Sequence, residues 1–169
     1  MPEIRAEKPS DVEGIRQLNR QAFPGPAEAA LVDLLRERGR NVVSLVAVVD
    51  GQIIGQVLFT EVSVTPSTPH KGVGLAPLAV LPAFQNRGIG TELGRKGLAL
   101  CGEKVYDFAI VLGNPGYYPR FGFRKASLFG LGNDYNEENP FMAVEFKPGV
   151  LGSFSGIVHY APEFSESGC

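Results

Sequence analysis

The sequence comprises 169 residues, of which 44% are apolar and 20% are charged, and its formal net charge is -2. This composition is typical of a folded globular chain and excludes disordered and collagen-like classes. The near balance of acidic and basic residues leaves no large positive field for a nucleic-acid backbone, and no long apolar run could span a membrane. We therefore expect a single domain over residues 1–169 that binds neither nucleic acid nor membrane.

The cysteines and histidines are few and widely separated: Cys101, Cys169, His70 and His159. Two distant cysteines do not make a disulfide framework, and the four side chains lack the spacing of metal ligands. The first residues carry charges where a secretory signal needs apolar ones. These observations predict a cytoplasmic protein without a metal site.

The first half of the chain predicts two helices and a β-hairpin. Ser10 and Glu13 have the spacing of a helix capping box, and a Pro-Gly-Pro run separates the two helical patterns. The dipeptide Asp50-Gly51 suits a type I′ turn between two valine-rich and isoleucine-rich strands. The expected strands lie at residues 3–7, 44–50 and 53–64, and the expected helices at 11–22 and 27–38.

The second half predicts one β-α-β unit followed by shorter elements. An apolar strand ends before Pro82, a helical pattern covers residues 88–104, and a buried strand covers 108–112. Because such crossovers join parallel strands, the strands around 74–81 and 107–112 are expected to pair in parallel. The remaining expected elements are a helical turn at 117–121, a strand after Gly122, a polar loop at 130–140, and strands at 141–147 and 154–160.

One segment carries most of the chemical information, because a strand there runs through a glycine-containing loop into a helix. Glycine has no Cβ to obstruct a ligand, and the first amides of a helix have no partner within it, so this junction suits an anion. Arg87 adds positive charge at the rim. The segment reads Leu78-Ala79-Val80-Leu81-Pro82-Ala83-Phe84-Gln85-Asn86-Arg87-Gly88-Ile89-Gly90-Thr91.

The spacing of this segment differs from two common phosphate-binding motifs. It lacks the Gly-Lys-Ser/Thr end of a P-loop and the three spaced glycines of a dinucleotide fingerprint. A nucleotide-binding enzyme is therefore the weaker alternative. A pyrophosphate is the ligand that the segment favours.

The stretch Gln85-Asn86-Arg87-Gly88-Ile89-Gly90 resembles the Q/R-x-x-G-x-G/A motif with which GNAT acetyltransferases hold the coenzyme A pyrophosphate. The preceding strand resembles the splayed fourth strand of that family, and Tyr118-Pro119-Arg120-Phe121-Gly122-Phe123 resembles its later Y-x-x-x-G-F element. Two further strings, at residues 75–80 and 113–118, resemble the YhbS-like bacterial branch of the family. The likeness covers about residues 3–147, which leaves 148–169 as a C-terminal extension.

This resemblance implies an α/β (α+β) fold, with a mixed, mostly antiparallel sheet of six or seven strands and helices on both faces. It implies acetyl transfer from acetyl-coenzyme A to a primary amine on a small molecule or peptide, by a monomer or a homodimer. Tyr118 would protonate the leaving thiolate, because a phenol has a pKa near that of a thiol. The residues implied in coenzyme binding are Leu78, Ala79, Val80, Gln85, Asn86, Arg87, Gly88, Ile89, Gly90, Thr91, Asn114 and Tyr118.

The general base and the acceptor are left open by the sequence. Glu61, on the strand after the hairpin, is the leading candidate base. The alternatives are that Glu61 is only an exposed strand carboxylate and that a water chain removes the proton. The acidic segment 131–139 either lies near a cationic acceptor or is a solvated loop. A second class of function is an acyl-coenzyme A binding or sensor module that keeps the fold but lacks transfer activity.

Overall fold

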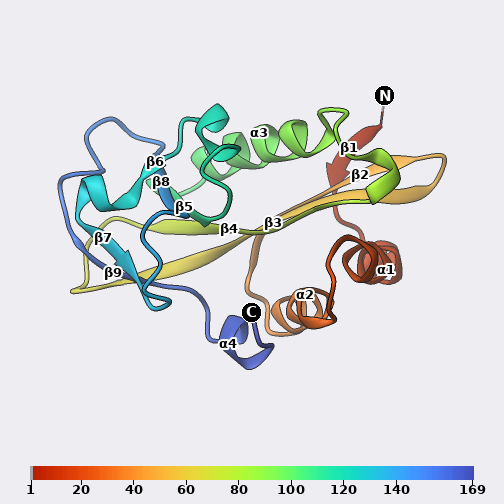
Figure 1. Ribbon diagram of the computed structural model, residues 1–169, viewed down its shortest axis with the longest axis horizontal. Coiled ribbons are helices and arrows are strands. Elements are labelled where there is room, and N and C mark those ends of the chain that lie inside the picture. Colours follow the sequence, from red (N-terminus) through yellow and green to blue (C-terminus); the bar gives the residue numbers. More distant parts are fainter. Residues whose placement is uncertain (1) are drawn as a thin grey trace. The chain divides into compact units, whose positions relative to one another are not determined.

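The computed structural model describes residues 2–169 (Figure 1). The chain divides into two compact units. Unit 1 comprises the described residues up to Phe59, together with Pro77–Gly97 and Pro162–Cys169. Unit 2 comprises Thr60–Ala76 and Leu98–Ala161. Three elements continue from one unit into the other: β3 (Gln52–Thr65), β4 (Gly72–Val80) and α3 (Ile89–Gly102).

Unit 1 contains the N-terminal strands in the order β1-β2-β3-β4. Strand β1 (Glu3–Ala6) pairs antiparallel with β2 (Asn41–Val49), and Glu3 lies opposite Val48. The turn from β2 into β3 has φ values of 48° at Asp50 and 77° at Gly51, which are those that a type I′ turn requires. The hairpin predicted from this dipeptide is therefore confirmed.

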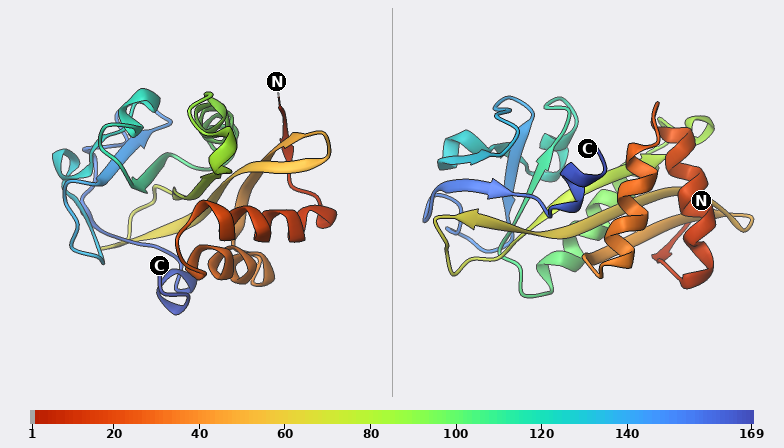
Figure 2. Two further views of the ribbon diagram at one scale, coloured as in Figure 1. Left: turned by 45° about the vertical axis from the view of Figure 1, so that its right-hand side comes forward. Right: turned by 90° about the horizontal axis from the view of Figure 1, so that it is seen from below.

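Helices cover both faces of the sheet in unit 1. Helices α1 (Val12–Ala22) and α2 (Ala27–Glu37) lie side by side on one face, and α3 lies on the other (Figures 1 and 2). Gly97 lets α3 approach the sheet, because a Cβ at this position would lie 2.4 Å from Cε2 of Phe59. Side chains of α1 and α2 that face the sheet are fully buried, among them Ile15, Leu18 and Leu35.

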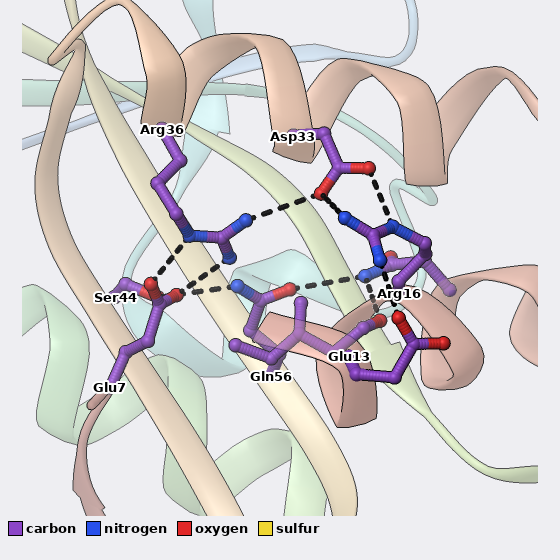
Figure 3. Close-up of polar contacts among 9 residues, drawn as sticks. Glu7, Glu13, Arg16, Asp33, Arg36, Ser44 and Gln56 are labelled. Atoms are coloured by element: carbon purple, nitrogen blue, oxygen red, sulfur yellow. Dashed lines mark hydrogen bonds and ion pairs between the residues drawn. The ribbon is translucent and has the colours of Figure 1, made fainter. Parts of the chain in front are cut away.

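A polar network ties α1 and α2 to β2 and to Glu7, the residue that follows β1 (Figure 3). The carboxylate of Glu7 accepts two hydrogen bonds from Arg36, at 2.7 and 3.1 Å, and one from Ser44 at 2.7 Å. Arg36 and Arg16 also share the carboxylate of Asp33, at 3.3 and 2.8 Å. Since these groups are partly buried, removal of one member would leave its partners desolvated and unmatched.

Unit 2 contains the strands in the order β3-β4-β5-β8-β6. Strand β4 pairs in parallel with β5 (Phe108–Leu112), with Gly72 opposite Phe108 and Gly74 opposite Ile110. The parallel pair predicted from the crossover is confirmed. Strand β8 (Phe141–Glu145) is antiparallel to both β5 and β6 (Arg124–Lys125).

Two short strands extend this sheet. Strand β9 (Gly156–His159) pairs antiparallel with β3 and parallel with β7 (Leu131–Asn133). The mixed, mostly antiparallel sheet predicted from the sequence is confirmed, and seven of the strands within residues 2–169 form its main path. The prediction of a polar loop throughout 130–140 is wrong at β7, because Leu131 packs in a core with Val158 and Phe141.

Two further local predictions differ from the structure. The expected capping box at Ser10 and Glu13 is absent from α1, because the Glu13 carboxylate instead binds Arg16 and Gln17. The C-terminal segment contains a short helix, α4 (Glu163–Glu166), which the sequence did not predict. No helix among residues 2–169 combines the length and apolar character that a membrane span needs.

Helix α4 is held within unit 1 by charge. The Glu163 side chain is fully buried and binds Arg38 at 3.1 Å and Arg40 at 2.8 Å. Burial works to raise the pKa of Glu163, but the hydrogen bonds from the two arginines outweigh it and lower that pKa below its usual value. The ionised carboxylate is therefore the form that anchors α4.

Candidate functional site

The strand-loop-helix segment lies entirely in unit 1. Strand β4 ends at Val80, a 3-10 turn (Pro82–Phe84) follows, and α3 begins at Ile89. The Gln85 amide donates to the Val80 carbonyl at 3.0 Å, which ties the loop back to the strand. The backbone of Gly88 has a φ of 81°, and a Cβ placed on it would meet nothing within 4 Å. The loop therefore turns sharply beside open space.

The start of α3 has the properties of an anion site. The first helical hydrogen bond runs from the Glu92 N–H to the Gly88 carbonyl at 3.0 Å, so the helix makes no use of the Ile89 and Gly90 amides. These amides lie at the positive end of the helix dipole. Arg87 is exposed, and its guanidinium lies 5.5 Å from the Phe84 ring.

A groove of about 630 Å³ adjoins this helix end within unit 1. Its positive lining comes from Arg87 and Lys96, and its apolar lining includes Ile4 and Phe84. The sequence analysis included Phe84 in the loop segment without giving it a role, and it did not single out Lys96. Their signal is weak in one sequence, because Lys96 becomes a neighbour of the loop only after the helix has formed.

The strands β4 and β5 separate in unit 2. Their paired register ends at Gly74 and Ile110, whereas Val111 and Leu112 continue to pair with β8. The Gly113 N–H donates to the Pro140 carbonyl at 3.0 Å, on the β8 side. Since successive residues of a strand direct their backbone groups to opposite edges, Leu112 directs its N–H to the β4 side. Within the described register, Leu112 thus pairs with β8 and has no residue of β4 opposite it.

Asn114 and Tyr118 belong to one turn that follows β5. The Asn114 side-chain oxygen accepts a hydrogen bond from the Gly116 N–H at 2.8 Å. The Asn114 backbone carbonyl accepts one from the Tyr117 N–H at 2.9 Å. These bonds form an Asx turn that leads into the 3-10 helix at Tyr118–Phe121. Asn114 thus fixes the direction in which the chain approaches Tyr118.

The Tyr118 ring packs into an aromatic group in unit 2. Its centroid lies 5.1 Å from that of Tyr117 and 5.8 Å from that of Phe123, with near-perpendicular planes in both pairs. Burial, with a smaller contribution from Tyr117, raises the pKa of Tyr118 to about 12. At neutral pH the phenol is therefore protonated and able to donate its proton.

Glu61 also lies in unit 2, on an exposed position of β3. Its carboxylate accepts a hydrogen bond of 3.3 Å from the Tyr106 hydroxyl. Burial, and then the Glu61 charge and hydrogen bond, raise the pKa of Tyr106. Glu61 is thus an accessible carboxylate with a phenol beside it, which the sequence did not associate with Tyr106.

The histidines and cysteines have local partners or are buried. His159 lies between Asp134 and Thr65, at 2.8 Å from each, and His70 lies 3.6 Å from Asp107. Burial raises the pKa of the Cys101 thiol to about 12, so it is not a thiolate at neutral pH. No group of three or more potential metal-ligating side chains occurs within the described part of the chain.

The predicted site residues thus fall into two groups. Leu78, Ala79 and Val80 precede the loop that carries Gln85, Asn86, Arg87, Gly88, Ile89, Gly90 and Thr91, and both segments belong to unit 1. Asn114, Tyr118 and Glu61 belong to unit 2, and the first two lie in a single turn.

The sequence pattern of the acetyltransferase (GNAT) family matches residues 12–123. The chain therefore belongs to this family of acyltransferases. It is 37% identical over 164 residues to the uncharacterized N-acetyltransferase YhbS of Escherichia coli strain K12, across 96% of this chain and 98% of YhbS. The predicted resemblance to the YhbS-like branch is confirmed.

Two solved structures are similar over nearly the whole chain. YhbS from Escherichia coli in complex with CoA superposes with a TM-score of 0.92 at 36% identity, across 97% of this chain and 92% of the other. A GNAT family acetyltransferase from Brucella melitensis in complex with acetyl-CoA superposes with a TM-score of 0.81 at 34% identity, across 97% and 98%. The predicted GNAT fold is confirmed by both.

Proposed function

We propose that this chain transfers an acetyl group from acetyl-coenzyme A to a primary amine. The observation that carries the proposal is the loop between β4 and α3, where open space at Gly88 adjoins the positive end of a helix. Related proteins with this fold bind CoA and acetyl-CoA. The residues present fit such a ligand, because its pyrophosphate needs amide donors and a nearby positive charge.

In this proposal the residues of unit 1 hold the pyrophosphate. The amides of Ile89 and Gly90 donate to it and Arg87 supplies positive charge, while Gln85 keeps the loop closed onto Val80. Lys96, which lines the adjoining groove, adds a second positive charge. The strand end Leu78–Val80 pairs with the amide groups of the pantetheine arm, as an added strand would.

The transfer step needs a fixed donor for the developing oxyanion and an acid for the leaving group. The amine nitrogen attacks the thioester carbonyl, the carbon-sulfur bond breaks, and a backbone amide near Val80 stabilises the oxyanion. Tyr118 donates its proton to the leaving sulfur. The phenol carries this proton at neutral pH, because its pKa lies well above 7.

Glu61 is the proposed base that removes the proton from the attacking ammonium group. Its exposure supports this role, because the carboxylate is accessible to solvent and to an incoming cation. We also propose that residues 1–169 form a single domain, because β3, β4 and α3 each run through both units. We further propose that the protein is a monomer or a homodimer and that it acts in the cytoplasm.

The proposal is tested first by ligand competition and then by turnover. Calorimetric titration should show saturation by acetyl-coenzyme A but not by ATP or NAD. A panel of small amines, polyamines and peptides, assayed by release of free thiol, should then contain at least one acceptor. Saturable binding with no thiol release in the whole panel would favour the acyl-coenzyme A sensor instead.

A further inference from the structure

Three polar side chains of unit 2 form a chain of hydrogen bonds across neighbouring strands. Asp134 follows β7, His159 ends β9 and Thr65 ends β3. Both carboxylate oxygens of Asp134 lie 2.8 Å from Nδ1 of His159, and the Thr65 hydroxyl lies 2.8 Å from Nε2. The order of carboxylate, imidazole and hydroxyl is that of the catalytic triad of serine hydrolases.

The pairing of the strands brings these side chains together on an open face. Strand β9 pairs with β3 along one edge and with β7 along the other, so Thr65 and Asp134 lie on opposite sides of His159. Successive side chains of a strand point to opposite faces. Because Val158 is fully buried and Ile157 is 43% exposed, His159 shares the open face with Ile157. A small substrate can therefore reach the three side chains.

The hydrogen bonds determine where the protons lie. An ionised carboxylate only accepts hydrogen bonds, so the proton of a neutral His159 ring is on Nδ1 and points to Asp134. Nε2 then carries a lone pair, and it accepts the hydrogen bond from the Thr65 hydroxyl. Among residues 2–169, His159 is the only hydrogen-bond partner of this hydroxyl. The imidazole is thus positioned to remove the hydroxyl proton as the oxygen attacks a substrate.

The other histidine of unit 2 lacks this arrangement. His70 lies 3.6 Å from Asp107, and the Asp107 carboxylate is already bound by Lys147 at 2.6 Å. The Ser153 hydroxyl lies 3.4 Å from His70 but donates its proton to the Val150 carbonyl. The Ser153 oxygen is therefore not activated by its histidine.

We propose that Thr65 is the nucleophile of a second activity, the hydrolysis of small acyl esters. The Thr65 oxygen attacks the ester carbonyl while His159 takes its proton, and the alcohol leaves with that proton. The acyl group stays on Thr65 until water, deprotonated by His159, attacks it and releases the carboxylic acid. Asp134 remains ionised and holds the ring. This activity uses none of the residues proposed for amine acetylation, so it can be tested independently.

The surroundings of Thr65 favour a small ester without negative charge. Ile157 lies opposite Thr65 in the strand register and offers an apolar contact for the acyl group. Together with Gly132, Glu137 and Glu138, it lines a cleft of about 200 Å³. The volume suits a short acyl chain, and the two carboxylates would repel an anionic substrate.

Hydrolysis of para-nitrophenyl acetate tests this activity, because the released phenolate is coloured and leaves without needing a proton. Thr65→Val removes the hydroxyl at nearly constant shape, whereas Thr65→Ser keeps it. His159→Gln and Asp134→Asn interrupt the other two positions. The matched control is Ser63→Ala, because Ser63 is an exposed hydroxyl on the same strand and lies opposite His159.

We expect Thr65→Val, His159→Gln and Asp134→Asn each to lower the rate of ester hydrolysis by at least about tenfold. Thr65→Ser and Ser63→Ala should keep at least about half of the wild-type rate. An aryl ester acylates faster than an alkyl ester hydrolyses, so acetyl-Thr65 should accumulate. Mass spectrometry after a rapid acid quench should find it, and hydroxylamine should remove it. Thr65→Val should still release thiol from acetyl-coenzyme A with an accepted amine.

Several outcomes would overturn the role of Thr65. An active Thr65→Val beside an inactive His159→Gln would make the imidazole itself the nucleophile. Acetyl groups found only on lysine, where hydroxylamine does not remove them, would point to unspecific acylation. Loss of both activities in Thr65→Val would assign Thr65 to the amine reaction and not to a second one. Ester hydrolysis by a wild type that acetylates no amine would support Thr65 and overturn the proposed function alone.

Discussion

Replacement of Gly113 by alanine tests whether the position of the Tyr118 ring controls turnover. The new Cβ would lie 2.2 Å from Cε2 of Tyr118 and 2.9 Å from Cδ2, whereas ordinary contacts begin at 3.4 Å. The nearest ring atom must therefore retreat by about 1.2 Å. A misplacement of roughly 1 Å can cost on the order of a hundredfold in rate, so we expect kcat to fall about 10- to 100-fold.

The substitution should also cost about 1–3 kcal/mol of stability, because it overpacks an aromatic group. The assay is thiol release at saturating acetyl-coenzyme A, beside thermal unfolding and calorimetric titration of the same variant. The matched control places Gly113→Ala in a Tyr118→Ala background, where the ring is absent and the new Cβ has room. An equal further loss of turnover in that background would refute the reasoning, since there would be no ring left to displace.

Gly88→Ala should weaken acetyl-coenzyme A at least about tenfold, since its Cβ enters the space proposed for the pyrophosphate; Gly39→Ala has a similar positive φ and open surroundings, so calorimetry should show it unchanged. Glu61→Gln should lower kcat/KM by about a hundredfold near neutral pH with little effect at high pH, where the amine is already neutral; a pH-rate profile parallel to the wild type would contradict this. The pKa of Glu163 is lowered in the folded state, so its stabilising contribution is present above the unfolded pKa and is lost as pH falls through the folded-state pKa. Glu163→Gln should therefore be less stable than the wild type at pH 7. Unfolding curves measured at acid pH should show a smaller difference in stability between the two proteins.

The parts of the fold that could be predicted depend on neighbours in the sequence. Asp50 and Gly51 adopt the positive φ values expected of their turn, because these residue types tolerate that conformation. The parallel pairing of β4 and β5 follows from the helical crossover that connects them. The spacing of the glycines in residues 85–90 likewise predicts the loop that these residues form.

The parts that could not be predicted depend on distant partners. Tyr160 is a late aromatic residue in the sequence, and only the folded chain brings its ring to Gly74. Helix α4 has no periodic apolar pattern that would predict it. Ion pairs of Glu163 with two arginines far earlier in the chain hold it instead. The prediction of a capping box at Ser10 is wrong, because the side chains of Arg16 and Gln17 bind the Glu13 carboxylate instead.

In the proposed reaction the chain moves an acetyl group from acetyl-coenzyme A to an amine, with Tyr118 as the acid. The most direct measurement is mass spectrometry of the accepted amine after incubation with acetyl-coenzyme A labelled with ¹³C in the acetyl group. We predict an amine that carries the labelled acetyl group and is formed in step with free thiol. Tyr118→Phe should form it on the order of a hundredfold more slowly at unchanged coenzyme affinity. Thiol release without a labelled amine, or an equal rate in Tyr118→Phe, would contradict it.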